Sequence, residues 1–241
     1  MAANTVGPLC FGHRGARAYE PENTLLSFET AIRMGVDGIE LDVYQSKDGH
    51  VVVTHSDALE IDGQRYRVSK LDLDEIKSIP LQKGQRLPTL DEVFETATMA
   101  RDGNPLLYSI DLKDMRAASA YHDVLQRHDV LDRTLTCLES RMFIKKVHRS
   151  HPDLSLVYST HVNPEGVLED LDKVDPAIVS VVNLPASEAT AAVLTSIKDA
   201  GLRAFVWDVN EVSIMNQFVP LADGLYSDYP DLLVKAARSS C

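Results

Sequence analysis

The sequence predicts an α/β fold, a single (β/α)8 barrel of the TIM type, from three observations. Short apolar or β-branched runs alternate with segments of helical period along most of the chain. Polar, chemically capable side chains follow several of these runs, where a parallel barrel builds its sites. The length of 241 residues fits one such barrel, which takes about 250 residues. Residues 1–241 are therefore interpreted as one domain.

The expected strands are short and rich in β-branched or aromatic residues. They are Leu9–His13, Gly38–Tyr44, Val51–His55, Leu106–Lys113, Thr134–Leu138, Ser155–Ser159, Ala177–Val182, Arg203–Val209 and Gly224–Ser227. The expected helices are Thr24–Met34, Leu90–Met99, Ala117–His128, Met142–Ser150 and Ser187–Ala200. In the first helix, Asn23 is the expected N-cap and Gly35 the end.

One strand more than a closed barrel needs is explained by a hairpin over residues 38–55. The segment between Tyr44 and Val51 is too short for a crossover helix, and its Asp48-Gly49 pair predicts a two-residue turn. We expect eight parallel β/α units plus this antiparallel ribbon. The second choice is a barrel that takes the return strand of the ribbon into its wall.

The hairpin gathers polar side chains on one strand face. Glu40 and Asp42 alternate with apolar residues, and a two-residue turn places Asp42 opposite His55 and Glu40 opposite Asp57. Carboxylates on a strand amid apolar residues are costly to bury unless positive charge meets them. A hard cation bound by these carboxylate oxygens would supply that positive charge. The alternative is a strand face that is exposed to solvent and binds nothing.

A third acid and two flanking groups extend this constellation. Asp111 and Lys113 share a face near the end of their strand, either as part of a site or as an internal ion pair. His13 and Arg14 end the first strand in a glycine-flanked turn. A pair of histidines, His13 and His55, is suited to share general base and general acid roles at neutral pH. No chemistry is expected of the other six, His50, His122, His128, His148, His151 and His161.

The composition limits the partners. Net charge is −12, from 24 Lys and Arg against 36 Asp and Glu, so nucleic acid is not an expected partner. Any phosphate must therefore be met by a metal ion or by placed Arg and Lys side chains. The cysteines Cys10, Cys137 and Cys241 show no zinc or disulfide spacing, which favours the cytoplasm. No signal peptide and no membrane-spanning segment are expected.

The order and spacing of several motifs resemble the glycerophosphodiester phosphodiesterase family. The motifs are His13-Arg14-Gly15-Ala16, Pro21-Glu22-Asn23-Thr24, Gly38-Ile39-Glu40-Leu41-Asp42-Val43, Lys47-Asp48-Gly49 and Val51-Val52-Val53-Thr54-His55. Residues 86–93, 205–210 and 224–230 also resemble segments of that family. The likeness covers almost the whole chain, is most specific in the first 57 residues and is weak over residues 115–200.

The resemblance implies hydrolysis of glycerophosphodiesters to sn-glycerol 3-phosphate and an alcohol, with one divalent metal ion, Ca²⁺ or Mg²⁺. The implied catalytic pair is His13 and His55. The implied metal ligands are Glu40, Asp42 and Asp111, and the implied substrate contacts are Arg14, Lys113 and Trp207. His13 is the preferred base and His55 the preferred acid. The nucleophile is either water or the glycerol 2-hydroxyl, which would give a cyclic phosphate.

Three departures from the family pattern affect these expectations. Asp111 stands where the family has Glu, so its carboxylate is about 1.5 Å less far-reaching. Ser56 separates His55 from Asp57, which puts the role of Asp57 in doubt. Asp208 stands where Thr is common, and an acid near the mouth would favour cationic head groups such as choline or ethanolamine.

Residues 56–88 form a long connection, interpreted either as a small cap over the barrel mouth or as a plain packed excursion. Two rival functions remain: lysophospholipase D-type activity on lysophospholipids, and a catalytically silent barrel that binds ligands. The head-group alcohol, the preferred metal and homo-oligomer formation are left open.

Overall fold

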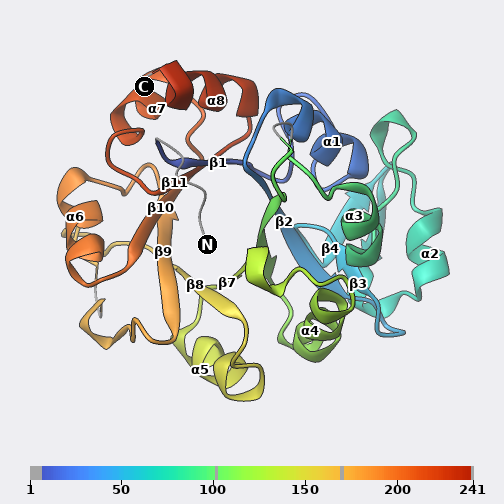
Figure 1. The fold of residues 1–241 in the computed structure, drawn as a ribbon. Coiled ribbons are helices and arrows are strands. Elements are labelled where there is room, and N and C mark those ends of the chain that lie inside the picture. Colours follow the sequence, from blue (N-terminus) through green and yellow to red (C-terminus); the bar gives the residue numbers. More distant parts are fainter. Residues whose placement is uncertain (1–6, 101–102, 169–170, 240–241) are drawn as a thin grey trace.

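The computed structural model describes residues 7–100, 103–168 and 171–239. Within these ranges, eight parallel strands form a ring in the order β1-β2-β6-β7-β8-β9-β10-β11, and β11 pairs with β1 to close it (Figure 1). The strands are β1 Leu9–Gly12, β2 Gly38–Gln45, β6 Leu107–Leu112, β7 Thr134–Leu138, β8 Ser155–Ser159, β9 Val179–Pro185, β10 Arg203–Trp207 and β11 Gly224–Ser227. The predicted barrel is confirmed.

Helices surround this ring. They are α1 Leu25–Met34, α3 Leu90–Thr96, α4 Ala118–Arg127, α5 Arg141–Ser150, α6 Ala191–Asp199, α7 Val212–Phe218 and α8 Pro230–Ser239. The last two were not anticipated from the sequence. The described part of the β8–β9 connection holds a 3-10 turn, Leu171–Lys173, in place of a helix. Over residues 7–100, 103–168 and 171–239, no helix has the length and apolarity to cross a bilayer.

The N-cap of α1 differs from the prediction by one residue. The hydroxyl of Thr24 accepts a hydrogen bond from the backbone N–H of Ser27, so Thr24 is the N-cap. Asn23 has a left-handed φ of 56° and directs its side chain elsewhere. The helix ends, as predicted, at Gly35, whose φ is 93°.

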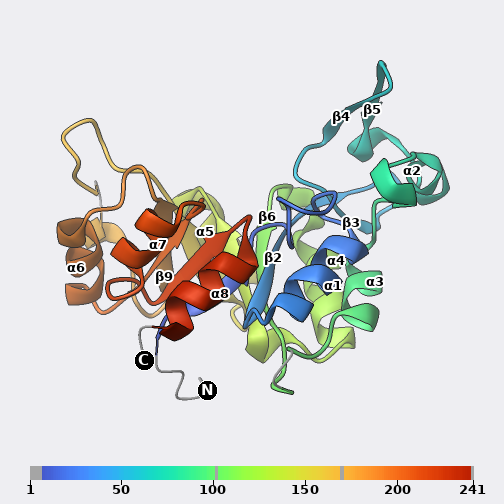
Figure 2. The same ribbon diagram turned by 90° about the horizontal axis from the view of Figure 1, so that it is seen from above.

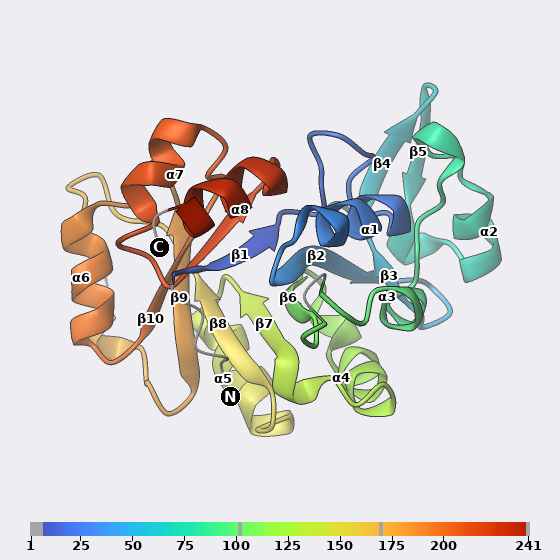
Figure 3. The same ribbon diagram turned by 45° about the horizontal axis from the view of Figure 1, so that its top comes forward.

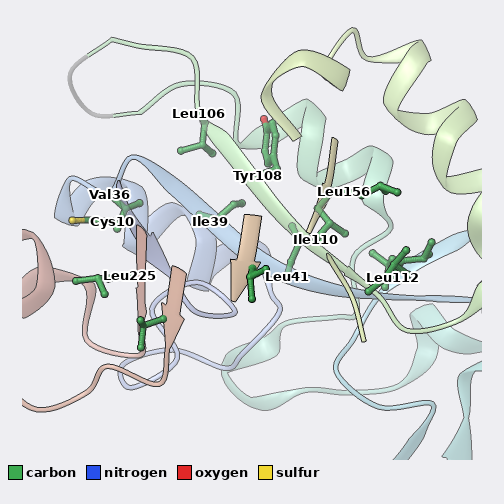
Figure 4. Packing of buried hydrophobic residues seen from close by; sticks show 14 of the residues in the cluster. Cys10, Val36, Ile39, Leu41, Leu106, Tyr108, Ile110, Leu112, Leu156 and Leu225 are labelled. Carbon is green, nitrogen blue, oxygen red and sulfur yellow. The ribbon is translucent and has the colours of Figure 1, made fainter. Parts of the chain in front are cut away.

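Strand alternation divides the apolar side chains into two layers. One group lies inside the barrel, where the rings of Phe11, Phe205 and Tyr226 lie within 5.9 Å of one another. The other group faces the helices, and Figure 4 shows part of it, including Ile39, Leu41 and Ile110. Since Leu41 faces the helices, its neighbours on β2 face the barrel interior.

The ribbon of β2 with β3 (Val51–Val53) is confirmed, but its turn is longer than predicted. The backbone N–H of Ser46 donates to the carbonyl of His50 at 2.9 Å, which leaves three residues in the loop. Gly49 occupies the left-handed region with a φ of 96°, as a type I turn with a bulge requires. The strand β3 pairs antiparallel with β2 and stays outside the ring, so the return strand does not enter the wall.

The longer turn shifts the register by one residue. Asp42 faces Thr54, whose backbone N–H donates to the Asp42 carbonyl at 2.9 Å. The predicted pairings of Asp42 with His55 and of Glu40 with Asp57 are therefore wrong. Asp57 turns away from the barrel and accepts a hydrogen bond from the backbone N–H of Ser69 at 2.8 Å.

The connection over residues 56–88 is an ordered insertion. It holds a two-stranded hairpin and a short helix: β4 Ala58–Ile61, β5 Gln64–Arg67 and α2 Leu73–Ser78. Its apolar side chains, with Val68 and Ile76 buried, pack on Val52 of the ribbon. Figures 2 and 3 show the insertion on the ribbon side of the barrel, with the hairpin projecting away from it.

Candidate active site

A cavity of about 180 Å³ lies inside the barrel at the carboxyl ends of its strands. All eight residues selected from the sequence line it: His13, Arg14, Glu40, Asp42, His55, Asp111, Lys113 and Trp207. Six further residues complete the lining: Glu139, Ser159, Thr160, His161, Asn183 and Tyr226. None of these lining residues belongs to the insertion at 56–88, which borders a separate open groove beside the loop of residues 17–22.

Three acids from adjacent strands converge in this cavity. Asp42 of β2 lies beside Asp111 of β6 in the register of the sheet, and Glu40 lies two residues before Asp42. One carboxylate oxygen from each acid lies within 4.8 Å of the others. The shorter side chain of Asp111 therefore does not remove it from the cluster.

Burial disfavours the charged forms of Glu40 and Asp111. Glu40 is 6% exposed and Asp42 is 1% exposed. Burial, followed by the charge of Asp42, raises the pKa of Glu40 to about 8. Burial also raises the pKa of Asp111, although Lys113 opposes it. Three carboxylates that converge on one point offer a set of oxygen donors that fits a hard divalent cation such as Ca²⁺ or Mg²⁺.

Two positively charged side chains, Lys113 and Arg14, flank the acids. The Nζ atom of Lys113 lies 2.6 Å from Asp111, 3.4 Å from Asp42 and 3.6 Å from Glu139. The internal ion pair considered from the sequence thus exists, inside the cavity. The Arg14 guanidinium donates from Nη1 to both Glu22 oxygens at 3.1 Å.

The turn after β1 fixes Arg14 in an uncommon conformation. Its φ is 52°, and its backbone N–H donates to Glu40 at 2.8 Å. The next residue, Gly15, has a φ of 83°, and a Cβ there would lie 2.3 Å from the Ser27 hydroxyl oxygen. That hydroxyl donates to the Arg14 carbonyl at 2.9 Å. The loop is thus held between the acidic cluster and helix α1.

His13 is held by carboxylates at one ring nitrogen. Its Nδ1 lies 2.8 Å from Asp228 and 3.2 Å from Asp208, while its Nε2 lies 3.8 Å from Glu40. Asn210 fixes Asp228 by donating from Nδ2 at 3.0 Å and accepting from the Asp228 backbone N–H at 2.8 Å. Burial opposes protonation of the ring, but Asp208 and Asp228 raise the pKa of His13 to about 10.

His55 lies at the rim of the cavity and is exposed. Partial burial lowers its pKa, and the nearby cations Arg14 and Lys113 add to this effect, although Asp42 opposes it. The two histidines therefore face the same cavity with pKa values displaced in opposite directions.

Trp207 ends β10 and turns its ring toward the cavity. It makes an edge-to-face contact with His161 at a centroid distance of 6.0 Å. His161, from which no chemistry was expected, lies here because its Nδ1 contacts Glu188 at 2.8 Å. Asp208, which follows Trp207, has a left-handed φ of 59° and faces His13. The carboxylate of Asp208 is thus already engaged by His13.

Several residues of the site were missed from the sequence. The amide of Asn23 donates to Asp42 at 3.0 Å, while Glu22 and Asp228 pair with Arg14 and His13. Glu22 and Asn23 lie within the quoted motif Pro21–Thr24, and Asp228 lies within 224–230, so a signal was present. Ser159 and Asn183 carried none, because a lone polar residue in an apolar run has no distinctive spacing.

Comparisons with known proteins identify the family. The profile of the glycerophosphoryl diester phosphodiesterase family matches residues 13–232. A glycerophosphodiester phosphodiesterase of Caldanaerobacter subterraneus subsp. tengcongensis is 26% identical, covering 95% of this chain and 98% of the relative. The crystal structure of the enzyme of that name from Thermotoga maritima is 28% identical, with a TM-score of 0.77 and coverage of 94% and 97%.

An Oleispira antarctica phosphodiesterase, solved in complex with the product sn-glycerol-3-phosphate, shares the fold. Its TM-score is 0.83 at 23% identity, over 96% of this chain and 97% of that one. The family profile spans all eight residues that were selected from the sequence. The predicted family and enzyme class are confirmed: this chain belongs to the glycerophosphoryl diester phosphodiesterase family.

Proposed function

We propose that this chain hydrolyses glycerophosphodiesters to sn-glycerol 3-phosphate and an alcohol, with one divalent cation held by Glu40, Asp42 and Asp111. The observation that supports this most is the convergence of three acids, two cations and two histidines in one cavity. The product complex of the Oleispira relative, which shares the fold, is consistent with this product. Cys10 and Cys137 are buried free thiols, so we also propose a reducing, cytoplasmic location.

The phosphate of the substrate would lie against the cationic side chains. Arg14 Nε is buried and lies 3.4 Å from a carboxylate oxygen of Asp42, but it forms no hydrogen bond within the part of the chain that the structure describes. This N–H donor and the Lys113 ammonium, both lining the cavity, are suited to phosphate oxygens. When bound, a divalent cation supplies further positive charge to a phosphate oxygen.

The contacts of the histidines favour one order of proton transfer. Asp228 and Asp208 stabilise the protonated ring of His13, which suits a donor to the leaving alkoxide. The pKa of His55 is lowered, which suits a base acting on the nucleophile. We therefore propose His13 as the acid and His55 as the base, the reverse of the preference from the sequence.

The nucleophile is either water or the glycerol 2-hydroxyl. A substrate methylated at the 2-hydroxyl separates these two routes. Hydrolysis of that substrate indicates water as the nucleophile. Complete resistance, with the methylated substrate still binding as a competitive inhibitor, indicates attack by the hydroxyl through a cyclic phosphate.

A metal-supplemented activity panel tests the proposed function. The panel compares glycerophosphocholine, glycerophosphoethanolamine, glycerophosphoinositol and lysophosphatidylcholine, with coupled detection of sn-glycerol 3-phosphate. We expect its release from the glycerophosphodiesters. Turnover of lysophosphatidylcholine alone would favour the lysophospholipase D-type activity. No turnover of any diester, with a thermal melt insensitive to chelator, would favour a barrel that only binds ligands.

A further inference from the structure

Two neutral polar side chains lie side by side on the wall that faces the acidic cluster. Ser159 of β8 and Asn183 of β9 are register partners, and both line the cavity. In the ring of eight described strands, β9 is four positions from β2 in either direction. Asn183 therefore lies across the barrel from Glu40 and Asp42.

One polar atom of each side chain, Ser159 Oγ and Asn183 Oδ1, is buried and forms no hydrogen bond. Over residues 7–100, 103–168 and 171–239, three buried side-chain nitrogen or oxygen atoms form no hydrogen bond: Arg14 Nε, Ser159 Oγ and Asn183 Oδ1. Of these, Arg14 Nε still lies 3.4 Å from a carboxylate oxygen of Asp42. All three residues line this one cavity. Asn183 as a whole is only 5% exposed. Buried polar atoms are nearly always paired, so this concentration of unpaired atoms indicates a bound group that completes them.

The hydrogen-bonding capacity of Asn183 and Ser159 indicates which part of a ligand could pair with them. The amide oxygen of Asn183 only accepts hydrogen bonds, so its partner must carry a donor. A phosphate diester oxygen has none, whereas a hydroxyl does. The Ser159 hydroxyl both donates and accepts, so it also complements a hydroxyl. Trp207, two residues beyond the register partner of Asn183 on β10, supplies an apolar surface next to this pair.

We propose that Ser159 and Asn183 bind the hydroxyl groups of the glycerol moiety and set the preference for glycerol over other alcohols. This inference rests on the proposed function, in which the acidic wall takes the phosphate. A pocket that hydrogen-bonds a substrate hydroxyl discriminates strongly against an analogue lacking it, because its buried polar groups then stay unpaired. The two residues would thus recognise the part of the substrate that remains on the phosphate after hydrolysis.

Calorimetric binding in metal-supplemented buffer tests the proposal without requiring turnover. The probes are sn-glycerol 3-phosphate and n-propyl phosphate, which lacks both hydroxyls. We expect the wild-type protein to bind sn-glycerol 3-phosphate at least about tenfold more tightly. We expect Asn183→Leu to remove most of that preference by weakening sn-glycerol 3-phosphate alone. Ser159→Ala, which deletes one hydroxyl, should act in the same direction and keeps the test valid if Asn183→Leu does not fold.

Ser180→Ala is the matched control, because Ser180 is an exposed serine of β9 whose hydroxyl contacts the Leu156 carbonyl at 3.4 Å. It should change neither affinity. Equal weakening of both probes in folded Asn183→Leu and Ser159→Ala would overturn the proposal, as would a wild-type protein without preference. Tight, hydroxyl-dependent binding with no turnover of any diester would instead contradict the proposed function and leave this inference standing.

Discussion

The two walls of the cavity differ in how their polar atoms are satisfied. On the acidic wall, Asp42 accepts a hydrogen bond from Asn23, and both Asp42 and Asp111 lie within ion-pair distance of Lys113. On the opposite wall, Ser159 and Asn183 keep polar atoms without any partner. A buried charge is far more costly to leave uncompensated than a neutral dipole. The carboxylates are therefore positioned by the protein itself, whereas these two neutral side chains are left for the ligand.

The strongest test of the acidic wall is removal of the cation. Treatment with a chelator should abolish hydrolysis of glycerophosphocholine, because three acids lose the charge that balances them and the phosphate loses its neutralising partner. Added Mg²⁺ or Ca²⁺ should restore the rate. Full activity in excess chelator would show that hydrolysis does not require a divalent cation.

Substitutions in the acidic wall should show a graded effect. Asp42→Asn keeps the shape but removes the charge, so kcat/KM should fall by more than about 100-fold. Asn23→Ala leaves Asp42 charged but removes the amide that donates to it at 3.0 Å. This variant should bind the metal more weakly, and its kcat/KM should fall by about 10- to 100-fold. Metal titration calorimetry and steady-state rates check both variants. An Asn23→Ala variant with wild-type metal affinity would show that Asp42 is held by other contacts.

The histidines should be separable by leaving group. His13→Ala and His55→Ala should each lower kcat on glycerophosphocholine by about two orders of magnitude or more, with the thermal melt unchanged. A diester with p-nitrophenol as leaving group needs no proton donor. On that substrate, His13→Ala, which lacks the proposed acid, should therefore lower kcat much less than on glycerophosphocholine. His55→Ala should lower kcat on both substrates to a similar extent. The opposite pattern would restore the assignment preferred from the sequence.

The pH profile gives a smaller but directional effect. A base acts only when neutral, and the pKa of His55 is displaced below its ordinary value of about 6.5. The rate kcat/KM should therefore persist below pH of about 6.5 and decline as pH falls through the lowered pKa of His55. The acidic limb should be missing from the residual rate of His55→Ala. An acidic limb centred above pH 7 in the wild-type enzyme would contradict this role, whereas a decline at alkaline pH belongs to the proposed acid His13.

Asp208 should have the smallest effect. Its carboxylate lies 3.2 Å from His13, so little of its charge is available to attract a cationic head group. Asn tolerates the left-handed φ of 59° at this position, so Asp208→Asn is the suitable change. The ratio of choline to inositol diester turnover should fall by about threefold or less, on the scale of an exposed charge pair. An unchanged ratio would exclude Asp208 from head-group selection.

The acidic wall was predictable and the neutral wall was not. Glu40 and Asp42 stand two apart in an apolar strand, and together with Asp111, Lys113 and the two histidines they favoured a site over a solvated strand face. The predicted strand 177–182 ended one residue before Asn183, which faces the interior on an extended β9. A single neutral polar residue near a strand end is ordinary in sequence, and only closure of the barrel shows that it faces the acids.

Local geometry explains the other differences. The turn at Gly49 holds three residues instead of two, which moved the pairing of Asp42 from His55 to Thr54. Asn23 was expected to cap α1, but it supports Asp42, because Thr24 takes the cap. In both cases the local sequence was compatible with two conformations, and it did not show which of the two the folded chain adopts.

One structure would test both walls together: a crystal grown with Ca²⁺ and sn-glycerol 3-phosphate. We expect a cation about 2.3–2.6 Å from oxygens of Glu40, Asp42 and Asp111. We also expect a glycerol hydroxyl hydrogen-bonded to Asn183. A cation bound elsewhere, or a glycerol moiety directed away from Asn183 toward the open groove, would contradict the proposed roles of the two walls.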